Sequence, residues 1–331
     1  MLETRQSRLR LLTPGLLLAL VVAAVATGLG RLLPVVGGPV FAIVLGALAA
    51  AAFPALRAPR WAPGYGVAST KVLQLSIVVL GTGLQVRQVL DVGAESLPVM
   101  LGTLAVALGG AWLLGRLLGV GGDTRTLIGV GTGICGASAI AATTAVLKPK
   151  QTHVAYALGT IFACNIAAVL IFPPIGHLLG LSPHAFGLWA GTAINDTSSV
   201  VAAGYAYGGD AGEYALVVKL TRTLMLIPIV AFLALRAARR SATTGPALPW
   251  RRIVPPFLLG FAAAVALGSL GVIPPGISAL GPFLITTVLA GIGLSLCPND
   301  LRRAGHRPLL LGVLLWIAVA ASSLGLQALT G

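Results

Sequence analysis

The sequence GTGICGASAIAA at residues 131–142 aligns with GTAINDTSSVVA at residues 191–202, and each stretch lies inside a long apolar run. The two stretches agree at a constant offset at five pairs of positions, namely Gly131/Gly191, Thr132/Thr192, Ile134/Ile194, Ser138/Ser198 and Ala142/Ala202. The agreement indicates either an internal repeat or chance similarity among small residues. Paired segments of this kind are typical of transporters built from inverted repeats.

Glycine is concentrated in the first stretch, where four glycines fall within residues 129–136. Each glycine destabilises a helix by about 1 kcal/mol relative to alanine, so a helix over residues 126–148 is expected to open here. A second half-helix would then point its free N–H groups at an anion near the middle of the membrane. The alternative is close packing of unbroken helices through glycine. In the broken-helix interpretation, which we favour, the residues that shape the site are Gly131, Gly133, Cys135, Gly136 and Ser138.

The chain as a whole has the composition of a polytopic membrane protein. Of its 331 residues, 57% are hydrophobic and 9% are charged, and the mean hydropathy is +0.97. A soluble domain carries about a quarter charged residues, and a disordered chain lacks this much apolar surface, so both classes are excluded. The net charge of +14 does not indicate a nucleic-acid partner, because the basic residues lie between apolar runs and orient the chain in the lipid bilayer.

Eleven apolar segments have about the 20 residues that a helix needs to cross a bilayer. They are residues 12–30, 35–53, 68–87, 97–118, 126–148, 153–175, 185–206, 214–235, 253–273, 279–297 and 308–328. A cytoplasmic N-terminus places most Lys and Arg residues on the cytoplasmic side. We therefore expect an all-α, multi-pass protein of the plasma (inner) membrane, with a single integral membrane domain.

The same charge distribution fits a second topology, in which segments 126–148 and 185–206 re-enter the membrane and nine helices span it. The two copies of the repeat then enter from opposite sides, whereas as spanning helices they run parallel. A weaker echo joins VLGTGLQV at residues 79–86 to VLAGIGLSL at residues 288–296. These two helices run in opposite directions in the predicted topology.

Residues 195–199, Asn-Asp-Thr-Ser-Ser, form the most polar run inside any predicted span. A carboxylate in the membrane is costly, so Asp196 is expected to face a cavity or a cation and is a functional candidate. It either binds a coupling proton or Na⁺, or serves as a fixed counter-ion to a basic residue. Asn195, Thr197 and Ser198 would add polar contacts to the substrate.

Lys219 and Arg222 lie deep in the apolar run VVKLTRTLMLIP, on one face of a helix because their spacing is i and i+3. Paired cations suit a sulfate-like or carboxylate substrate, to which Arg offers a planar fork and Lys a point charge. Alternatively, the pair neutralises Asp196 within a structural network. Two cations against one carboxylate would still leave a net positive charge.

The sequence gives little sign of metal, cofactor or enzyme chemistry. Cys135, Cys164 and Cys297 lack the spacing of a metal site, and the four histidines are not paired for metal binding. An integral membrane enzyme acting on a lipid-linked substrate would use Cys135 or Ser138 as its nucleophile. That alternative is disfavoured because no histidine or second carboxylate is placed to act as base.

These motifs resemble the YeiH-like family of membrane proteins, whose name as sulfate exporters suggests a substrate. The resemblance rests on the 131–142 and 191–204 blocks, on VVKLTR at residues 217–222, and on the blocks ending in GLQV and GLSL. The YeiH-like family in turn looks like part of the broader bile acid, arsenite and riboflavin transporter superfamily. The resemblance implies about ten helices, inverted repeats, and a core with crossing broken helices that moves against a panel.

We therefore expect a secondary transporter of a small anion such as sulfate or sulfite, which is either coupled to a proton or Na⁺ gradient or a uniporter, and which can form a homo-oligomer. The sequence contains no nucleotide-binding motif, so primary ATP-driven transport by this chain alone is not indicated. A cation/proton antiporter that uses Asp196 is the alternative within the transporter class. The residues assigned to the substrate are Gly131, Gly133, Cys135, Gly136, Ser138, Asn195, Thr197, Ser198, Lys219 and Arg222, with Asp196 assigned to the coupling ion.

Overall fold

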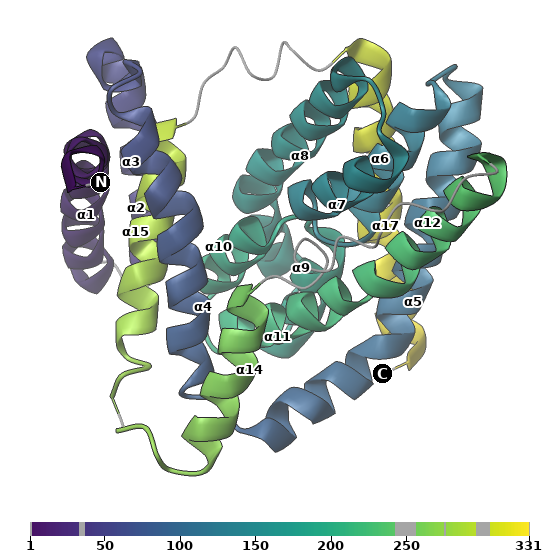
Figure 1. Ribbon diagram of the computed structural model, residues 1–331. Coiled ribbons are helices and arrows are strands. Elements are labelled where there is room, and N and C mark those ends of the chain that lie inside the picture. The colour runs from purple at the N-terminus through teal and green to yellow at the C-terminus, as the bar shows by residue number, and fades with distance from the viewer. Residues whose placement is uncertain (1, 33–36, 242–255, 275, 296–304, 331) are drawn as a thin grey trace. The chain divides into compact units, whose positions relative to one another are not determined.

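The computed structural model describes residues 2–32, 37–241, 256–274, 276–295 and 305–330, and every regular element within them is helical (Figure 1). The predicted apolar segments fall on single helices or on consecutive helices, so the all-α prediction is confirmed. Six helices of the described residues are long and apolar enough to cross a membrane, and shorter apolar helices accompany them. Residues 35–36, 253–255 and 296–297 of three predicted segments, Cys297 included, lie outside the described residues.

Contacts divide the chain into two compact units that alternate along the sequence. The first unit contains residues 1–88 and 257–297. Its elements are α1 (Leu2–Leu32), α2 (Gly37–Ala52), η1 (Pro54–Arg57), α3 (Ala62–Val67), η2 (Ala68–Val72), α4 (Leu73–Gly81), α14 (Pro256–Ser269) and α15 (Leu280–Ser295).

Glycines bring helices of the first unit into close contact. Gly281 at the start of α15 packs on Leu80 at the end of α4, and Gly291 near the end of α15 packs on Ala68 of η2. α15 therefore runs antiparallel to η2 and α4, as expected for the two glycine-leucine blocks that end these helices. Small residues at such contacts let membrane helices approach closely, which strengthens their packing.

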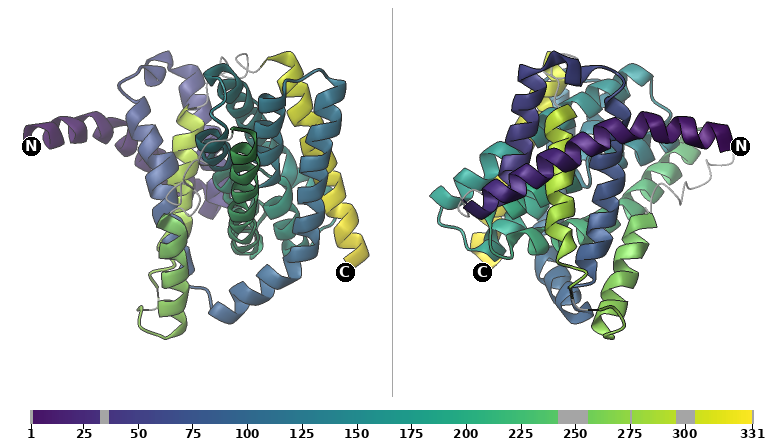
Figure 2. Two further views of the ribbon diagram at one scale, coloured as in Figure 1. Left: turned by 45° about the vertical axis from the view of Figure 1, so that its right-hand side comes forward. Right: turned by 90° about the vertical axis from the view of Figure 1, so that its left-hand side faces the viewer.

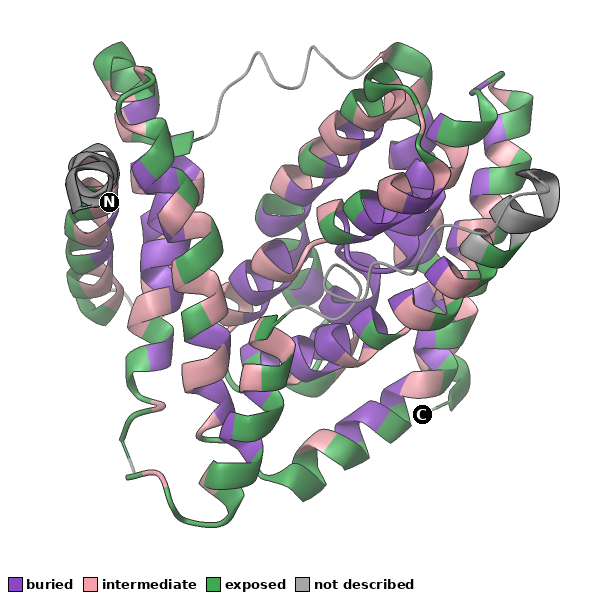
Figure 3. Cartoon of the chain, viewed as in Figure 1, coloured by how far each residue is buried: buried purple, intermediate pink, exposed green. Residues whose placement is uncertain are grey.

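The second unit contains residues 89–256 and 298–331. Its helices are α5 (Val86–Leu117), α6 (Gly122–Gly133), α7 (Ala137–Leu147), α8 (Gln151–Leu178), α9 (Pro183–Ala193), α10 (Thr197–Tyr207), α11 (Ala211–Leu224), α12 (Leu226–Ser241) and α17 (His306–Thr330). They are coloured from blue through green, with α17 in yellow, in Figures 1 and 2. Buried residues are concentrated on the short helices α6, α9, α10 and α11 (Figure 3).

Two pairs of short helices form helical hairpins in this unit. Hairpin A consists of α6 and α7, which residues 134–136 separate, and hairpin B consists of α9 and α10, which residues 194–196 separate. Each of these helices has 11 or 12 residues and is therefore about 17 Å long. That length is about half of a hydrocarbon core of about 30 Å. The predicted break in segment 126–148 is confirmed, and segment 185–206 is broken in the same way.

Hairpin A begins and ends at one end of the long helix α8. Asp123 at the start of α6 contacts His153 at the start of α8, with 3.5 Å between Oδ2 and Nδ1. Only residues 148–150 separate the end of α7 from the start of α8. Hairpin A therefore enters the unit and returns to the same end.

Hairpin B begins and ends at the opposite end of α8. α9 follows α8 after residues 179–182. At the end of α10, Tyr207 stacks on His177 of α8, with ring centroids 4.2 Å apart, and donates a hydrogen bond to the Leu181 carbonyl. Of the two topologies that the sequence left open, the described helices therefore match the re-entrant one, because segments 126–148 and 185–206 fold as hairpins that begin and end at opposite ends of α8.

Candidate functional site

The tips of the two hairpins meet inside the second unit. Hairpin A turns through Ile134 and Gly136, and hairpin B turns through Ile194 and Asp196, which are the C-cap and N-cap residues of the flanking helices in each case. Equivalent residues differ by a constant offset in sequence, as the alignment predicts. A Cβ atom at Gly136 would lie 3.5 Å from the backbone of Asn195. The shared cap positions support an internal repeat over a chance similarity.

Gly136 has a backbone conformation that suits glycine. Its φ of 62° and ψ of −125° lie in a region that costs other residues about 1–3 kcal/mol. A side chain there would also meet Ile161 of α8 at 3.3 Å. The close approach of the two tips therefore depends on this glycine.

Lys219 of α11 holds both tips together. Its ammonium group donates one hydrogen bond to the Ile134 carbonyl, at 2.8 Å, and another to the Ile194 carbonyl, at 2.7 Å. The side chain is 0% exposed. These carbonyls belong to the C-terminal ends of α6 and α9, where a cation is stabilising because the helix dipole is negative.

Arg222 lies one turn further along the same face of α11, as its spacing predicts, and is also 0% exposed. Its Nη1 donates a hydrogen bond to the Thr192 carbonyl near the end of α9. Its Nε and Nη2 atoms are buried without a partner in the described residues, and so are both amide atoms of Asn195. Buried polar atoms of this kind carry a free-energy penalty unless water or a ligand satisfies them.

Asp196 caps hairpin B and does not pair with the two cations. Its carboxylate accepts hydrogen bonds from the Ser198 amide, at 3.0 Å, and from the Ser198 hydroxyl. Among the described residues, no ion pair joins it to Lys219 or Arg222. The alternative in which Asp196 is a direct counter-ion of the basic pair therefore finds no ion pair among the described residues, and none of their carboxylates contacts Lys219 or Arg222.

The predicted site residues fall into two layers. Ser138 is exposed, and Asp196, Thr197 and Ser198 are partly exposed, so polar groups at the two tips are accessible. The residues behind them are buried: Cys135, Gly136, Asn195, Lys219 and Arg222.

Gly131 and Gly133 take no part in the accessible layer. Gly131 packs on Ile140 and Ile161, and Gly133 packs on Leu104 and Ala107. They serve close helix packing, which is the role that the alternative interpretation gave to glycine.

The structure adds polar residues that the sequence did not single out. Asn165 of α8 is buried with its Oδ1 unpartnered, one turn after the Ile161 that packs on the tip glycine. Thr192 shares a hydrogen bond of 2.7 Å with Ser323 of α17, to which Gln327 also donates. Asn165 and Ser323 could have been found in the sequence, because each is a polar residue within the apolar run that forms α8 or α17.

Comparison with known proteins identifies the family to which the chain belongs. Residues 14–312 match the family model described as "Conserved hypothetical protein 698". A UPF0324 membrane protein of Streptococcus pyogenes is 41% identical over 328 residues, covering 95% of this chain and 96% of the relative. Relatives of the same name from Streptococcus pneumoniae and Fusobacterium nucleatum are 40% and 37% identical, over 96% of this chain and 97% and 98% of theirs. The chain therefore belongs to the UPF0324 family of membrane proteins, which confirms the YeiH-like resemblance.

Proposed function

We propose that the chain is a secondary transporter of a small anion of the sulfate class, which binds where the tips of hairpins A and B meet. Broken helices that enter from opposite sides and meet at mid-membrane are the architecture of many ion-coupled transporters. The accessible polar layer at Ser138, Thr197 and Ser198 gives a solute hydroxyl groups to bind. The plasma membrane with a cytoplasmic N-terminus is the location that the charge distribution favours.

The uncompensated charge behind the tips carries this proposal. Two helix C-termini and two helix N-termini meet there, each with a partial charge of about half a unit, so their contributions cancel. Lys219 and Arg222 add two positive charges, and Asp196 adds one negative charge. The sum is about one positive charge in a region of low dielectric constant, where an anion is strongly attracted. Hydrogen bonds of the cations to carbonyl groups leave that charge in place.

Asp196 is the candidate for the coupling ion in this scheme. It is partly exposed beside the accessible hydroxyl groups, and its hydrogen bonds come from Ser198 alone among the described residues. A proton or Na⁺ bound to its carboxylate would remove the negative charge nearest to the anion. Substrate and coupling ion would then bind together, because each reduces the repulsion that the other meets.

The test is a flux assay in proteoliposomes with sulfate, sulfite and organic sulfonates. Arg222→Gln and Lys219→Gln are expected to lower anion flux at least tenfold, since each removes a charge from the tip region. The matched control is Thr221→Val, because the hydrogen bond of the Thr221 hydroxyl among the described residues goes to the Val217 carbonyl of its own helix, at 2.9 Å. Anion flux that survives both neutralisations would overturn the proposal.

A second readout does not depend on the stability of the charge variants. Ser138→Cys places a thiol on the accessible layer, where a negatively charged thiosulfonate reagent is expected to modify it. Saturating sulfate should slow that modification if the anion binds at the tips. Protection by Na⁺ alone, together with Na⁺ flux and no anion flux, would favour the antiporter instead.

An enzymatic role finds no support in the described contacts of the tip. Ser138 donates its hydroxyl hydrogen to the Cys135 carbonyl at 3.1 Å, and no hydrogen bond of the described residues joins either side chain to a base. Transport that persists in the double variant Cys135→Ala, Ser138→Ala would exclude both residues as essential nucleophiles.

A further inference from the structure

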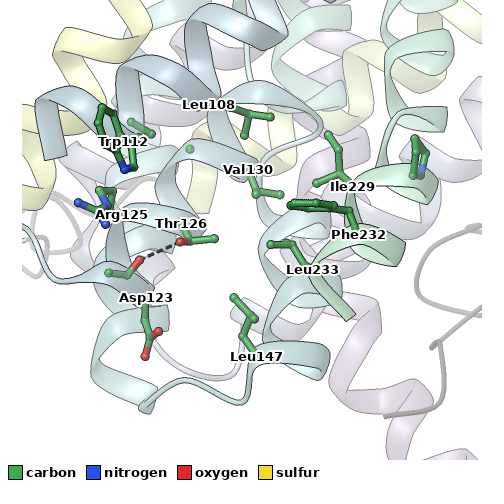
Figure 4. A pocket seen from close by; sticks show the side chains of 14 residues that line it. Leu108, Trp112, Asp123, Arg125, Thr126, Val130, Leu147, Ile229, Phe232 and Leu233 are labelled. Atoms are coloured by element: carbon green, nitrogen blue, oxygen red, sulfur yellow. Dashed lines mark hydrogen bonds between the residues drawn. The ribbon is translucent and has the colours of Figure 1, made fainter. Parts of the chain in front are cut away.

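A cleft of about 740 Å³ opens in the second unit between α5, α6, α7 and α12 (Figure 4). Residues 134–136 and 194–196 of the hairpin tips do not line it, although it reaches Val130, one turn before the tip of hairpin A. One wall is formed by α6 and by Leu147 at the end of α7, and the other by α5 and α12. The side chains that matter here are Leu108, Trp112, Arg125, Ile229, Phe232 and Leu233.

The polarity of the cleft changes with depth. Asp123, Arg125 and Thr126 line its mouth in the first turns of α6, whereas Leu108 and Ile229 line the part further from the helix ends. Leu108 lies nine residues before the end of α5, which corresponds to about 13 Å of depth. That depth is nearly half of a hydrocarbon core of about 30 Å.

The cleft is lined by large apolar side chains that the other residues of the described second unit leave exposed. Trp112 is 57% exposed and Phe232 is 61% exposed. In a membrane protein such surfaces are covered by lipid chains. A ligand with an apolar tail therefore fits the cleft better than a small hydrophilic solute does.

Arg125 is the charged group at the mouth that remains available. Asp123 contacts His153, and the Thr126 hydroxyl donates to the Gly122 carbonyl at 2.8 Å. The methylene stem of Arg125 rests on Gly115 of α5, where an added Cβ would lie 2.5 Å from the Arg125 Cδ. Among the described residues no carboxylate pairs with its guanidinium.

The surroundings of this mouth are basic. Arg116 is exposed at the end of α5, Lys148 and Lys150 follow α7, and Arg307 at the start of α17 approaches Gly119. Basic residues concentrate at the cytoplasmic surface of a membrane, where anionic lipids attract them. Basic pockets between membrane helices on that side bind phosphate headgroups.

We propose that this cleft binds an anionic phospholipid, with the phosphate on Arg125 and one acyl chain along Trp112 and Phe232. Arginine suits this role because its planar fork matches phosphate oxygens. The lipid would fill the space between α12 and both helices of hairpin A. Hairpin A would therefore be held in place by lipid on one side and by its tip contacts on the other.

The binding test uses the full chain, purified in a neutral detergent, with phosphatidylglycerol or phosphatidylcholine added in titration and bound lipid counted by native mass spectrometry. Wild type is expected to retain phosphatidylglycerol preferentially. Arg125→Gln should weaken that binding about fivefold, the contribution of one basic residue at an anionic membrane surface. Arg116→Gln is the matched control, since Arg116 is exposed at the same end but does not line the cleft.

Two further experiments test whether the position of the Arg125 charge matters and whether the site recognises the whole lipid or only its phosphate headgroup. Gly115→Ala keeps every charge but displaces the Arg125 stem, so it should also weaken phosphatidylglycerol binding. Glycerol phosphate at millimolar concentration should not displace the lipid, because it lacks the acyl chains. Melting temperatures of all variants confirm that the chain remains folded.

Three results would overturn the proposal. The first is equal retention of phosphatidylglycerol and phosphatidylcholine by wild type. The second is an unchanged lipid preference in folded Arg125→Gln protein. The third is full displacement by glycerol phosphate, which would identify a site for soluble anions. None of these readouts depends on transport, so they test the cleft independently of the proposed function.

Discussion

Replacing Lys219 with methionine is expected to release the two hairpin tips from each other. The ammonium group donates to the Ile134 and Ile194 carbonyls at 2.8 and 2.7 Å. Hydrogen bonds from charged donors contribute about 1.5–3 kcal/mol each. Methionine removes both bonds but also removes the cost of burying the ammonium group, which is several kcal/mol. The lost hydrogen bonds and the relieved burial cost are of similar size and offset each other. The two carbonyls left buried without a partner cost about 1–3 kcal/mol each, so we expect tip opening to become easier by about 2–6 kcal/mol.

Cys135 provides a natural probe of this opening. Its side chain is 2% exposed and lies between Ile134 and Gly136 in the tip of hairpin A. In a background in which Cys164 and Cys297 are replaced by serine, a maleimide reagent reports how often the tip opens. A change of about 2–6 kcal/mol corresponds to labelling about 30- to 20,000-fold faster in Lys219→Met, since 1.4 kcal/mol is a factor of ten.

The control for this measurement is Thr221→Val, which should change the labelling rate no more than about twofold because its hydroxyl bonds within α11. The melting temperature of each variant separates local opening from global unfolding. A folded Lys219→Met protein whose Cys135 reacts at the wild-type rate would refute the conclusion that Lys219 fastens the tips.

Three other substitutions test single contacts. Asp196→Asn should change the free energy of unfolding by no more than a few tenths of a kcal/mol, because asparagine caps helices as well as aspartate does. The dependence of anion flux on a proton or Na⁺ gradient should be lost in this variant. Unchanged gradient dependence would show that Asp196 does not bind the coupling ion. Gly136→Ala should destabilise the chain by about 1–3 kcal/mol, since its φ of 62° disfavours a side chain. Gly109→Ala is the control: Gly109 lies in α5 with no neighbour within 4 Å of an added Cβ, so this change should raise stability by up to about 1 kcal/mol. The melting temperatures of the two glycine variants should therefore move in opposite directions, and equal shifts would contradict the strain at the tip. Ser323→Ala removes the partner of the Thr192 hydroxyl and should lower the free energy of unfolding by about 1 kcal/mol in thermal unfolding. Ser322→Ala is the control and should not reproduce this loss fully, because the Ser322 hydroxyl bonds within its own helix at 3.0 Å.

Local composition was sufficient to predict where the hairpins break. Glycine-rich residues 129–136 lower helix stability wherever the chain goes, and the alignment of residues 131–142 with 191–202 carries the same break to the second segment. The i and i+3 spacing of Lys219 and Arg222 likewise fixes a common face without any knowledge of tertiary structure. These predictions hold because they depend on neighbours in the sequence.

Topology and partners depend on distant residues, and there the sequence was insufficient. A segment of 23 residues is long enough for one spanning helix or for two half-helices. The excess of Lys and Arg on the cytoplasmic side is kept in both cases, although Lys148 and Lys150 change sides. The contact of Asp123 with His153 distinguishes them. Similarly, charge counting suggested Asp196 as the partner of Lys219, but the backbone carbonyls of two helix ends are the partners. Carbonyl groups occur at every residue, so no residue type marks them in a sequence.

The shared ammonium group of Lys219 also has a mechanical consequence. A sliding movement of either hairpin along the membrane normal would stretch one of two short hydrogen bonds, so the tips are constrained to travel together with α11. Under the proposed function, an anion bound at the tips would move together with hairpins A and B and α11 as one rigid body. Alternating exposure to the two aqueous phases would come from displacement of this whole body, and a cross-link between the two tips should leave transport intact.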